Sequence, residues 1–242
     1  ISIGTDFEYL NDFYLGINNS NFYEVIETNS TASAQQQAQE GNYWDSFMKF
    51  NFNYDKRNQK FQTSDGFKSF YSLDLPIISD TNTIKNYYNY SHYFDFFKKN
   101  FSSISIYLQS ANSLNNKDIK LSERINIPSN RLRGFEAGRV GPKDGDDFVG
   151  GNYAYSINFA SNIPQLFEES QSIDFLIFAD AADIWGVDYN SSIDGEGIRS
   201  SIGVALDWMT PIGPMSFSFA HPITKKDGDV TETFRFNLGT TF

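Results

Sequence analysis

Few residues of this chain could perform catalytic chemistry. The 242 residues include no cysteine and only two histidines, His92 and His221. A cysteine nucleophile and a thiolate metal site are therefore excluded, and two histidines are too few for the usual zinc ligand sets. His92 shares an alternating face with Tyr88 and Tyr90, which indicates packing, and no Ser or Asp pattern would orient His221 as in a catalytic triad. We predict no catalytic residue, and keep a barrel enzyme acting through a histidine as the least favoured alternative.

One acidic segment resembles a calcium-binding loop at first sight. Its oxygen-bearing residues alternate along the chain: Asp188, Asn190, Ser192, Asp194 and Glu196. A calcium loop needs glycine at its sixth position and glutamate at its twelfth, and here those positions are Ile193 and Arg199. We predict an ordinary polar loop, with no metal site and no cofactor.

The overall composition narrows the class of protein. With 19 Lys+Arg against 30 Asp+Glu the net charge is −11, which argues against nucleic-acid binding because a phosphate backbone needs a basic surface. The mean hydropathy is −0.44, and no apolar run approaches the roughly 20 residues of a membrane-spanning helix. Yet 17% of the residues are aromatic, including 24 Phe and 14 Tyr. A hydrophilic chain with so many rings needs a structural explanation.

Strict alternation of apolar and polar residues supplies that explanation. In the segment 152–160, Tyr153, Tyr155, Ile157 and Phe159 fall on one face, and small or polar residues fall on the other. A soluble β-sandwich also alternates, but these segments run to about 10–15 residues, whereas average strands have about 5–6. Polar residues also lie well inside the segments: Lys49, Asn51, Asn53, Asp55, Asp95, Gln109 and Arg235. A wet inner face and an apolar outer face are typical of a transmembrane β-barrel.

The elements that would position any site are eleven strands, and the predicted fold class is an all-β antiparallel transmembrane barrel. The strands are expected at 1–10, 13–27, 42–55, 67–78, 84–97, 101–114, 148–163, 172–185, 198–210, 214–224 and 230–242. Long polar connections at 28–41, 115–147 and 186–197 alternate with short turns, as in outer-membrane barrels. Aromatic residues near strand ends fit interfacial girdles: Tyr9, Trp44, Tyr87, Trp185 and Trp208. Because a closed antiparallel barrel needs an even strand number, and because Ile1 follows no signal peptide, we expect residues 1–242 to be the C-terminal part of a longer barrel domain.

The longest loop carries a motif, Arg133-Gly134-Phe135, and the strand 172–185 carries Asp180. Here the chain resembles the BamA-like family of outer-membrane protein assembly factors, whose relatives include TamA and the two-partner-secretion transporters. The resemblance implies that the loop at about 115–147 folds into the barrel lumen and that Arg133 pairs with Asp180. The chain departs from the family at Ala160, where relatives can carry a second acidic partner for the arginine, and at Ala182, where they often carry glycine.

Further segments extend the resemblance over most of the chain. They are the strand-turn-strand 54–66, the Gly150-Gly151-Asn152 start of a strand, the turn 208–214, and a C-terminal strand that resembles an outer-membrane recognition signal. In that last strand the expected signal and seam residues are Phe234, Phe236, Leu238, Gly239 and Phe242. The resemblance implies about 11 of 16 strands, with the first strands and the periplasmic POTRA repeats absent from this sequence, and a Gly239 that loosens the seam.

The function implied by the resemblance is non-enzymatic assembly and insertion of β-barrel proteins in the bacterial outer membrane. The expected partners are the outer-membrane lipid bilayer, nascent β-barrel proteins and accessory assembly lipoproteins, with no nucleic acid. Incoming strands would pair with an unsatisfied strand edge at the seam. The alternatives are a TamA-like or two-partner-secretion translocation channel, and a passive pore.

Overall fold

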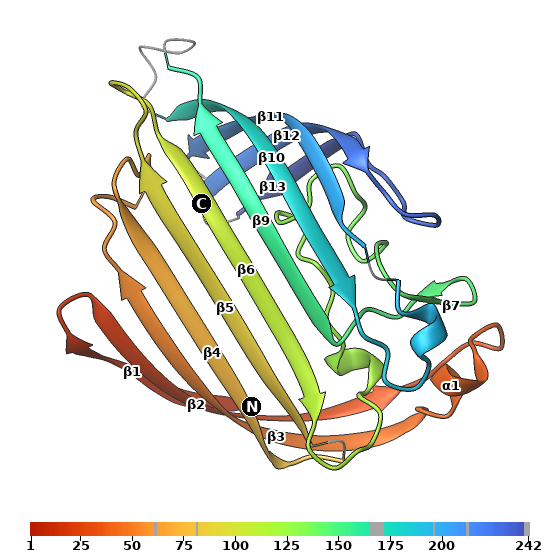
Figure 1. Ribbon diagram of the computed structural model, residues 1–242. Coiled ribbons are helices and arrows are strands. Elements are labelled where there is room, and N and C mark those ends of the chain that lie inside the picture. The colour runs from red at the N-terminus through yellow and green to blue at the C-terminus, as the bar shows by residue number, and fades with distance from the viewer. Residues whose placement is uncertain (61, 81, 165–171, 196, 212, 240–242) are drawn as a thin grey trace.

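The computed structural model describes residues 1–60, 62–80, 82–164, 172–195, 197–211 and 213–239 (Figure 1). They form an all-β fold dominated by one antiparallel sheet of eleven strands. Its strands are β1 (Ser2–Leu10), β2 (Phe13–Ile26), β3 (Gly41–Asp55), β4 (Gly66–Ile78), β5 (Thr83–Phe94), β6 (Ser102–Ser113), β9 (Tyr153–Asn162), β10 (Ile173–Trp185), β11 (Arg199–Thr210), β12 (Gly213–Thr224) and β13 (Phe234–Leu238). None of the helices in these described ranges has the length and apolar character needed to cross a membrane.

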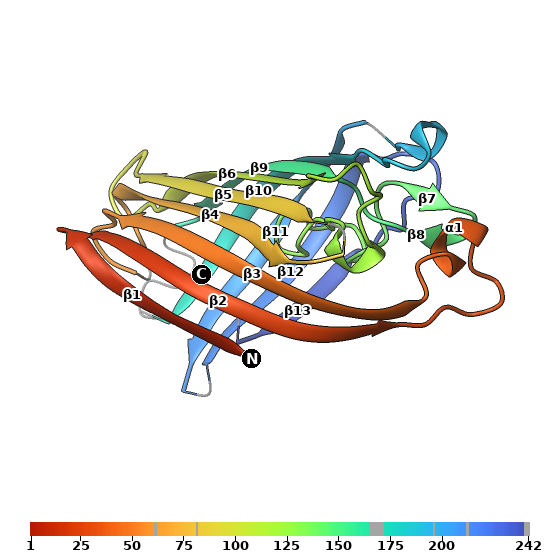
Figure 2. The ribbon, with the colours of Figure 1, turned by 90° about the horizontal axis from the view of Figure 1, so that it is seen from below.

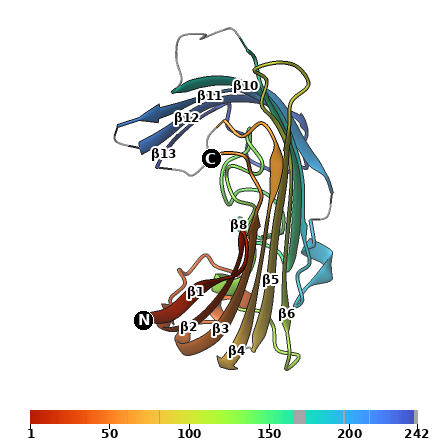
Figure 3. The ribbon, with the colours of Figure 1, turned by 90° about the vertical axis from the view of Figure 1, so that its left-hand side faces the viewer.

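The strands lie side by side in chain order, and each pairs antiparallel with its neighbours. The sheet is strongly curved and open, with β1 and β13 as its two edges (Figure 3). Between β6 and β9 the chain leaves the sheet through residues 114–152, which we call the inward loop because it lies on the concave side (Figure 3). The inward loop carries a small hairpin of β7 (Lys143–Asp144) and β8 (Asp147–Phe148).

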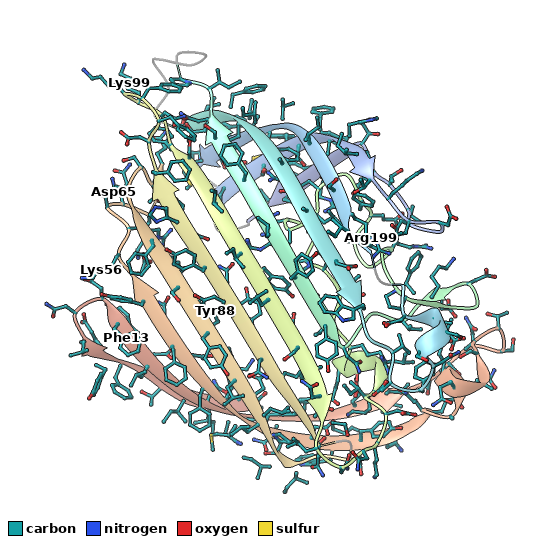
Figure 4. The ribbon with its side chains drawn as sticks, viewed as in Figure 1. Phe13, Lys56, Asp65, Tyr88, Lys99 and Arg199 are labelled. Carbon is teal, nitrogen blue, oxygen red and sulfur yellow. The ribbon has the colours of Figure 1, made fainter. Side chains whose placement is uncertain are left out.

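The two faces of the sheet have the chemistry that the alternation predicts. Large apolar side chains are exposed on the outer face, among them Ile17, Phe52, Ile104, Leu108, Ile157, Ile177, Ile202, Phe219, Phe234 and Phe236. Tyr88 pairs with Leu108 across the ladder and lies on this convex face (Figure 4). The inner face carries serine, asparagine and charged residues. Such a sheet has an apolar surface for hydrocarbon and a polar surface for a lumen.

The buried core lies between the inward loop and the inner wall, not between two sheets. Ile119, Ile125, Leu132, Phe135 and Val140 of the loop pack with buried residues of β6, β9 and β10. The wall contributes Tyr107, Ala111, Ala154, Ala182 and Ile184. The loop is therefore a packed part of the fold, and its burial fixes the position of its polar residues.

Connections at the two ends of the strands differ in character. Phe13, Lys56, Asp65 and Lys99 lie at one end of the sheet, and Arg199 lies toward the other end, which includes the long inward loop (Figure 4). The short helix α1 (Ala34–Gln37) and the hairpin strands β7 and β8 gather at the end of the longer connections (Figure 2). Ser33 caps α1 with a capping box that includes Gln36.

The structure corrects several sequence expectations. The strand expected from residue 148 begins at Tyr153, because Phe148 pairs with Lys143 in the hairpin and Gly150 turns with φ +69°. The strand expected at 230–242 spans only Phe234–Leu238, and residues 240–242 lie outside the described residues. Tyr87, expected in an interfacial girdle, faces inward and packs edge-on against Tyr107 with ring centroids 5.4 Å apart.

Candidate functional site

A polar row crosses three strands on the inner wall. In the antiparallel ladders, Asp180 of β10 lies directly opposite Asn158 of β9 and Ser201 of β11. Residues opposite each other share a face of the sheet, so all three side chains point into the lumen. The amide Nδ2 of Asn158 donates to Asp180 Oδ1 at 2.8 Å and also to the carbonyl of Arg131 at 2.8 Å. The row thus presents an oriented carboxylate to the inward loop.

Arg133 of the inward loop binds this carboxylate at three points. Its Nε donates to Asp180 Oδ2 at 2.8 Å, its Nη2 donates to Oδ1 at 2.8 Å, and its backbone N–H donates to Oδ2 at 3.1 Å. The Asp180 side chain is fully buried and the Arg133 side chain is 16% exposed. Two parallel guanidinium bonds to a buried carboxylate form a strong and geometrically specific pair. The structure therefore brings together the two residues that the resemblance pairs.

Neighbouring residues hold the guanidinium and the loop backbone in place. The guanidinium carbon of Arg133 lies 3.4 Å from the centre of the Phe178 ring, a cation–π contact, and Phe178 lies two residues before Asp180 on the same face. Ser201 Oγ donates to the carbonyl of Arg133. Gly134 adopts φ +93°, and a Cβ there would lie 3.1 Å from Ala220 Cβ and 3.3 Å from Ser201 Cβ. Glycine at this position permits both the backbone conformation and the close approach to β11 and β12.

Beyond Gly134 the loop backbone pairs with the segment that leads into β13. Phe135, which is 1% exposed, forms a β-bridge with Thr231. The amide of Glu232 donates to the carbonyl of Gly134 at 3.0 Å, and the amide of Val230 donates to the carbonyl of Arg139 at 3.0 Å. Residues 134–139 and 230–232 therefore form a short ladder inside the curved sheet.

Arg235 of β13 strengthens the same connection with its side chain. Its Nη1 donates to the carbonyl of Ser129 at 2.6 Å and its Nη2 donates to the carbonyl of Phe135 at 2.6 Å. Its Nε also donates to Glu232 Oε2 at 3.0 Å. The last strand thus contacts both sides of the Arg133-Gly134-Phe135 turn.

A second ion pair fixes the beginning of the inward loop to a distant strand. Lys120 Nζ contacts Asp45 of β3, and lies 3.4 Å from Glu24 Oε2 of β2; the Lys120 side chain is 2% exposed. Burial by itself lowers the pKa of Lys120, but the hydrogen bond that Lys120 donates to Asp45, together with the nearby carboxylates, raises it above its ordinary value. Lys120 is therefore charged at neutral pH, and ion pairs hold the inward loop near its beginning, at Lys120, and at its middle, at Arg133.

The residues expected at the seam lie on β13 and just after it. Phe234, Phe236 and Leu238 alternate on the outer face and are 46%, 45% and 55% exposed. Gly239 follows the end of the strand with φ +74°, and its amide donates to the carbonyl of Pro214 at 2.8 Å. Phe242 lies outside the described residues. On its side away from β12, β13 has no partner strand in the part of the chain that the structure describes.

Groups considered for other chemistry are placed apart from this cluster. His92 and His221 are exposed, and His92 stacks on Phe94 with ring centroids 5.9 Å apart. Asp188 contacts Arg124 of the inward loop. No group of three or more potential metal-binding side chains is found among the described residues. The arrangement can bind and position a loop, and it contains no arranged nucleophile and base.

Sequence reasoning missed Asn158, Ser201 and Arg235. A signal for Asn158 and Ser201 lies in the alternation, because each is a polar residue on an inward position of a strand next to that of Asp180. The partners of Arg235 are backbone carbonyls of an irregular loop, and no periodic pattern points to them.

A single antiparallel sheet with an apolar convex face, a polar concave face and a long loop locked inside defines the barrel domain of an outer-membrane protein. The chain belongs to the Omp85 superfamily, whose domain matches residues 2–242. The chain is located in the bacterial outer membrane.

Individual relatives agree with this assignment. The chain is 35% identical over 140 residues to the outer membrane protein assembly factor BamA of Neisseria meningitidis, covering 46% of this chain and 17% of that protein. It is 30% identical over 152 residues to a SAM50-like protein of Schizosaccharomyces pombe, covering 58% of this chain and 31% of that protein. The crystal structure of Haemophilus ducreyi BamA lacking POTRA domains 1–3 superimposes with a TM-score of 0.81 and 26% identity, over 97% of this chain and 52% of that chain. The chain thus spans well under two thirds of the length of each of these relatives.

Proposed function

We propose that this chain is the barrel portion of an outer-membrane protein assembly factor, which inserts β-barrel proteins into the membrane without bond-breaking chemistry. The observation that carries the proposal is the inward loop, whose Arg133 is bound by Asp180 while its backbone pairs with the segment before β13. Relatives named as BamA support the same function. The substrates are nascent β-barrel proteins, and accessory lipoproteins are the expected partners.

In this proposal the seam is the free edge of β13. Only five residues of β13 pair with the 12-residue β12, so the last strand is the least extensively paired strand of the described sheet. Such an edge presents unpaired N–H and C=O groups that an incoming strand can bind. The outward Phe234, Phe236 and Leu238 put this edge at the lipid boundary, and Gly239, directly after the strand, has a left-handed φ of +74°.

The inward loop gives the edge a fixed support from the lumen side. Arg133, Gly134, Phe135 and Asp180 act together as a lock between the loop and β10. The loop occupies the concave side of the sheet with a packed hydrophobic core, which argues against a passive pore. A secretion channel of the two-partner type shares the loop, and it is separated from an assembly factor by its substrate range.

The test is depletion of the full-length protein in its own host, followed by quantification of the outer-membrane proteome. An assembly factor predicts that many unrelated β-barrel proteins fall together, and that the wild-type gene restores them while an Asp180→Ala gene restores them less well. Loss of a single exported protein, with the other barrels unchanged, would contradict the proposal and favour a dedicated channel.

A reconstituted assay supplies the second measurement. The full-length protein in lipid vesicles should accelerate folding of a urea-unfolded β-barrel substrate, compared with vesicles that contain an unrelated barrel. Equal folding rates in both vesicles would contradict direct insertion activity.

A further inference from the structure

Arg235 is the one charged residue of β13, and its side chain does not point toward free lumen. The Arg235 side chain is 11% exposed, and its guanidinium donates to two carbonyls of the inward loop, those of Ser129 and Phe135. These carbonyls flank the turn that carries Arg133 and Gly134. A single side chain of the last strand therefore holds the loop on both sides of its lock.

The backbone makes the same connection independently. Glu136 donates its amide to the carbonyl of Val230 at 2.9 Å, in addition to the ladder contacts of Gly134 and Arg139. The segment before β13 is itself fixed, because Asp229 accepts a bond from Arg199 Nε at 3.0 Å and both side chains are 1% exposed. Residues 229–235 are therefore held between the wall and the loop.

We propose that Arg235 is a positioning residue that couples the inward loop to the last strand, so that the loop cannot leave Asp180 without loosening β13. Release of the Arg133–Asp180 lock then loosens the edge of β13, at which substrates are proposed to pair. The coupling is a property of this fold, and only its consequence for assembly rests on the proposed function.

The geometry requires an arginine and not merely a positive charge. The guanidinium offers donors in a planar fork: here Nη1 donates to Ser129, Nη2 donates to Phe135, and Nε and Nη2 both donate to Glu232. A lysine ammonium is a single point at the end of a flexible stem, and it cannot reach two carbonyls on opposite sides of the turn while it also pairs with Glu232. Arg235→Lys keeps the charge and removes the fork, so it separates positioning from simple charge compensation.

The experiment is hydrogen–deuterium exchange on the full-length protein in lipid nanodiscs, followed for peptides that cover 134–139 and 230–239. In Arg235→Lys we expect the slow amides of both peptides to exchange about tenfold faster, the effect of losing one charge-assisted hydrogen bond. The matched control is Arg139→Gln, which removes the exposed guanidinium of an arginine in the same loop, paired with the exposed Glu136, and keeps the backbone carbonyl of residue 139. Wild-type exchange at either peptide in Arg235→Lys, or equal acceleration in the control, would overturn the proposal.

A double-mutant cycle tests the coupling itself. Asp180→Asn weakens the Arg133–Asp180 lock. On its own it should accelerate hydrogen exchange of the 230–239 peptide, but combined with Arg235→Lys it should accelerate that exchange little beyond the Arg235→Lys single variant. Independent, additive effects would show that lock and strand are not connected.

A measurement without substitution covers the case in which a variant does not fold. In the wild-type protein the two peptides should become exchange-competent in one step as urea is raised, because one opening event exposes both. Two separate steps would overturn the coupling. Because none of these readouts uses assembly activity, their failure is distinguishable from a failure of the proposed function, which the depletion and vesicle experiments measure.

Discussion

Asp180 accepts three hydrogen bonds from Arg133, two from the guanidinium and one from the backbone amide. One carboxylate on the inner wall therefore positions both the guanidinium and the backbone of Arg133 in the inward loop. The Asp180 side chain is fully buried, so its charge depends on these contacts for compensation. Removal of the Asp180 carboxylate should therefore destabilise the protein.

Asp180→Ala should lower the free energy of unfolding of the full-length protein by about 3–5 kcal/mol, the typical cost of removing one partner of a buried ion pair. Urea unfolding in detergent micelles, followed by the shift between folded and unfolded gel mobility, measures it. Asp146→Ala, at an exposed turn residue of the loop hairpin, is the control and should change little. The charge swaps Arg133→Asp and Asp180→Arg should each be harmful, and the double swap should recover part of the loss; no recovery at all would remove support for the pair.

Gly134→Ala should destabilise the lock, because the added methyl group strains the backbone and also crowds the neighbouring side chains. A second variant, at Gly138, separates these two effects. Gly138 also has a positive φ, +71°, but a Cβ there would meet nothing within 4 Å. Gly138→Ala should therefore cost about 1–2 kcal/mol of backbone strain, whereas Gly134→Ala should add about 1–3 kcal/mol of overpacking against Ala220 and Ser201. The same unfolding measurement compares the two variants. Equal losses would mean that the close approach contributes nothing.

Phe178→Leu should weaken the hold on Arg133 without removing its salt bridge. The lost cation–π contact is worth about 0.5–2 kcal/mol, so the variant should fall between wild type and Asp180→Ala in stability. Phe219→Leu, on the exposed outer face, removes an equal ring that faces away from the loop. If both variants lose the same stability, the contact with Arg133 is not the cause.

The Lys120 contact predicts how loop docking depends on pH. Its pKa is raised above 10.5 in the folded state, so the stabilisation is complete below the unfolded value and is lost as the pH rises through the folded value. Proteolysis of the segment around residue 120 should therefore be equally slow from neutral pH to mildly alkaline pH, and should accelerate only above pH 10.5.

Variants at this site check the assignment. Lys120→Met should make the segment protease-sensitive already at neutral pH, because it leaves Asp45 buried without its cation. Lys117→Met, at an exposed lysine nearby, should not. Early proteolysis of the wild-type protein at mildly alkaline pH would contradict the role given to Lys120.

Gly239→Val addresses the seam. Valine strongly disfavours the φ of +74° found here, so the substitution should shift the backbone of residue 239 away from its left-handed conformation. Under the proposed function, substrate insertion into vesicles should slow while the barrel stays folded. Gly228→Val, at φ +87° in the connection before β13, imposes similar strain away from the seam. Unchanged insertion by Gly239→Val would argue against a seam role for this glycine.

Alternation in the sequence predicts which segments form strands and which face each side chain takes, because side chains two residues apart share a face of a strand. The order of the strands in the sheet follows from the antiparallel barrel architecture and not from the alternation. The alternation also contains the evidence that Tyr87 faces inward, since its neighbour Tyr88 faces outward. Strand ends are less well encoded. The sequence before Tyr153 contains no signal that separates the hairpin strand at Asp147–Phe148 from the next strand, so the start of β9 at Tyr153 depends on the turn at Gly150.

The candidate site is only partly readable from sequence. Arg133 and Asp180 follow from a family motif, but the partner role of Asn158 requires the register of β9 on β10, which alternation does not specify. The contacts of Arg235 require the path of an irregular loop whose position depends on its buried Phe135 and Leu132. The contacts of Asn158 and Arg235 are determined by tertiary packing and not by the local sequence pattern.

The polar row of Asn158, Asp180 and Ser201 forms only when the three strands pair in the native register. If β10 slipped by one residue against β9, Asp180 would turn toward hydrocarbon and Arg133 would lose its acceptor. The loop can therefore dock only on a wall whose strands are correctly aligned. The Arg133–Asp180 contact therefore requires the native register of β10 on β9, and it adds its free energy only to a sheet that has that register.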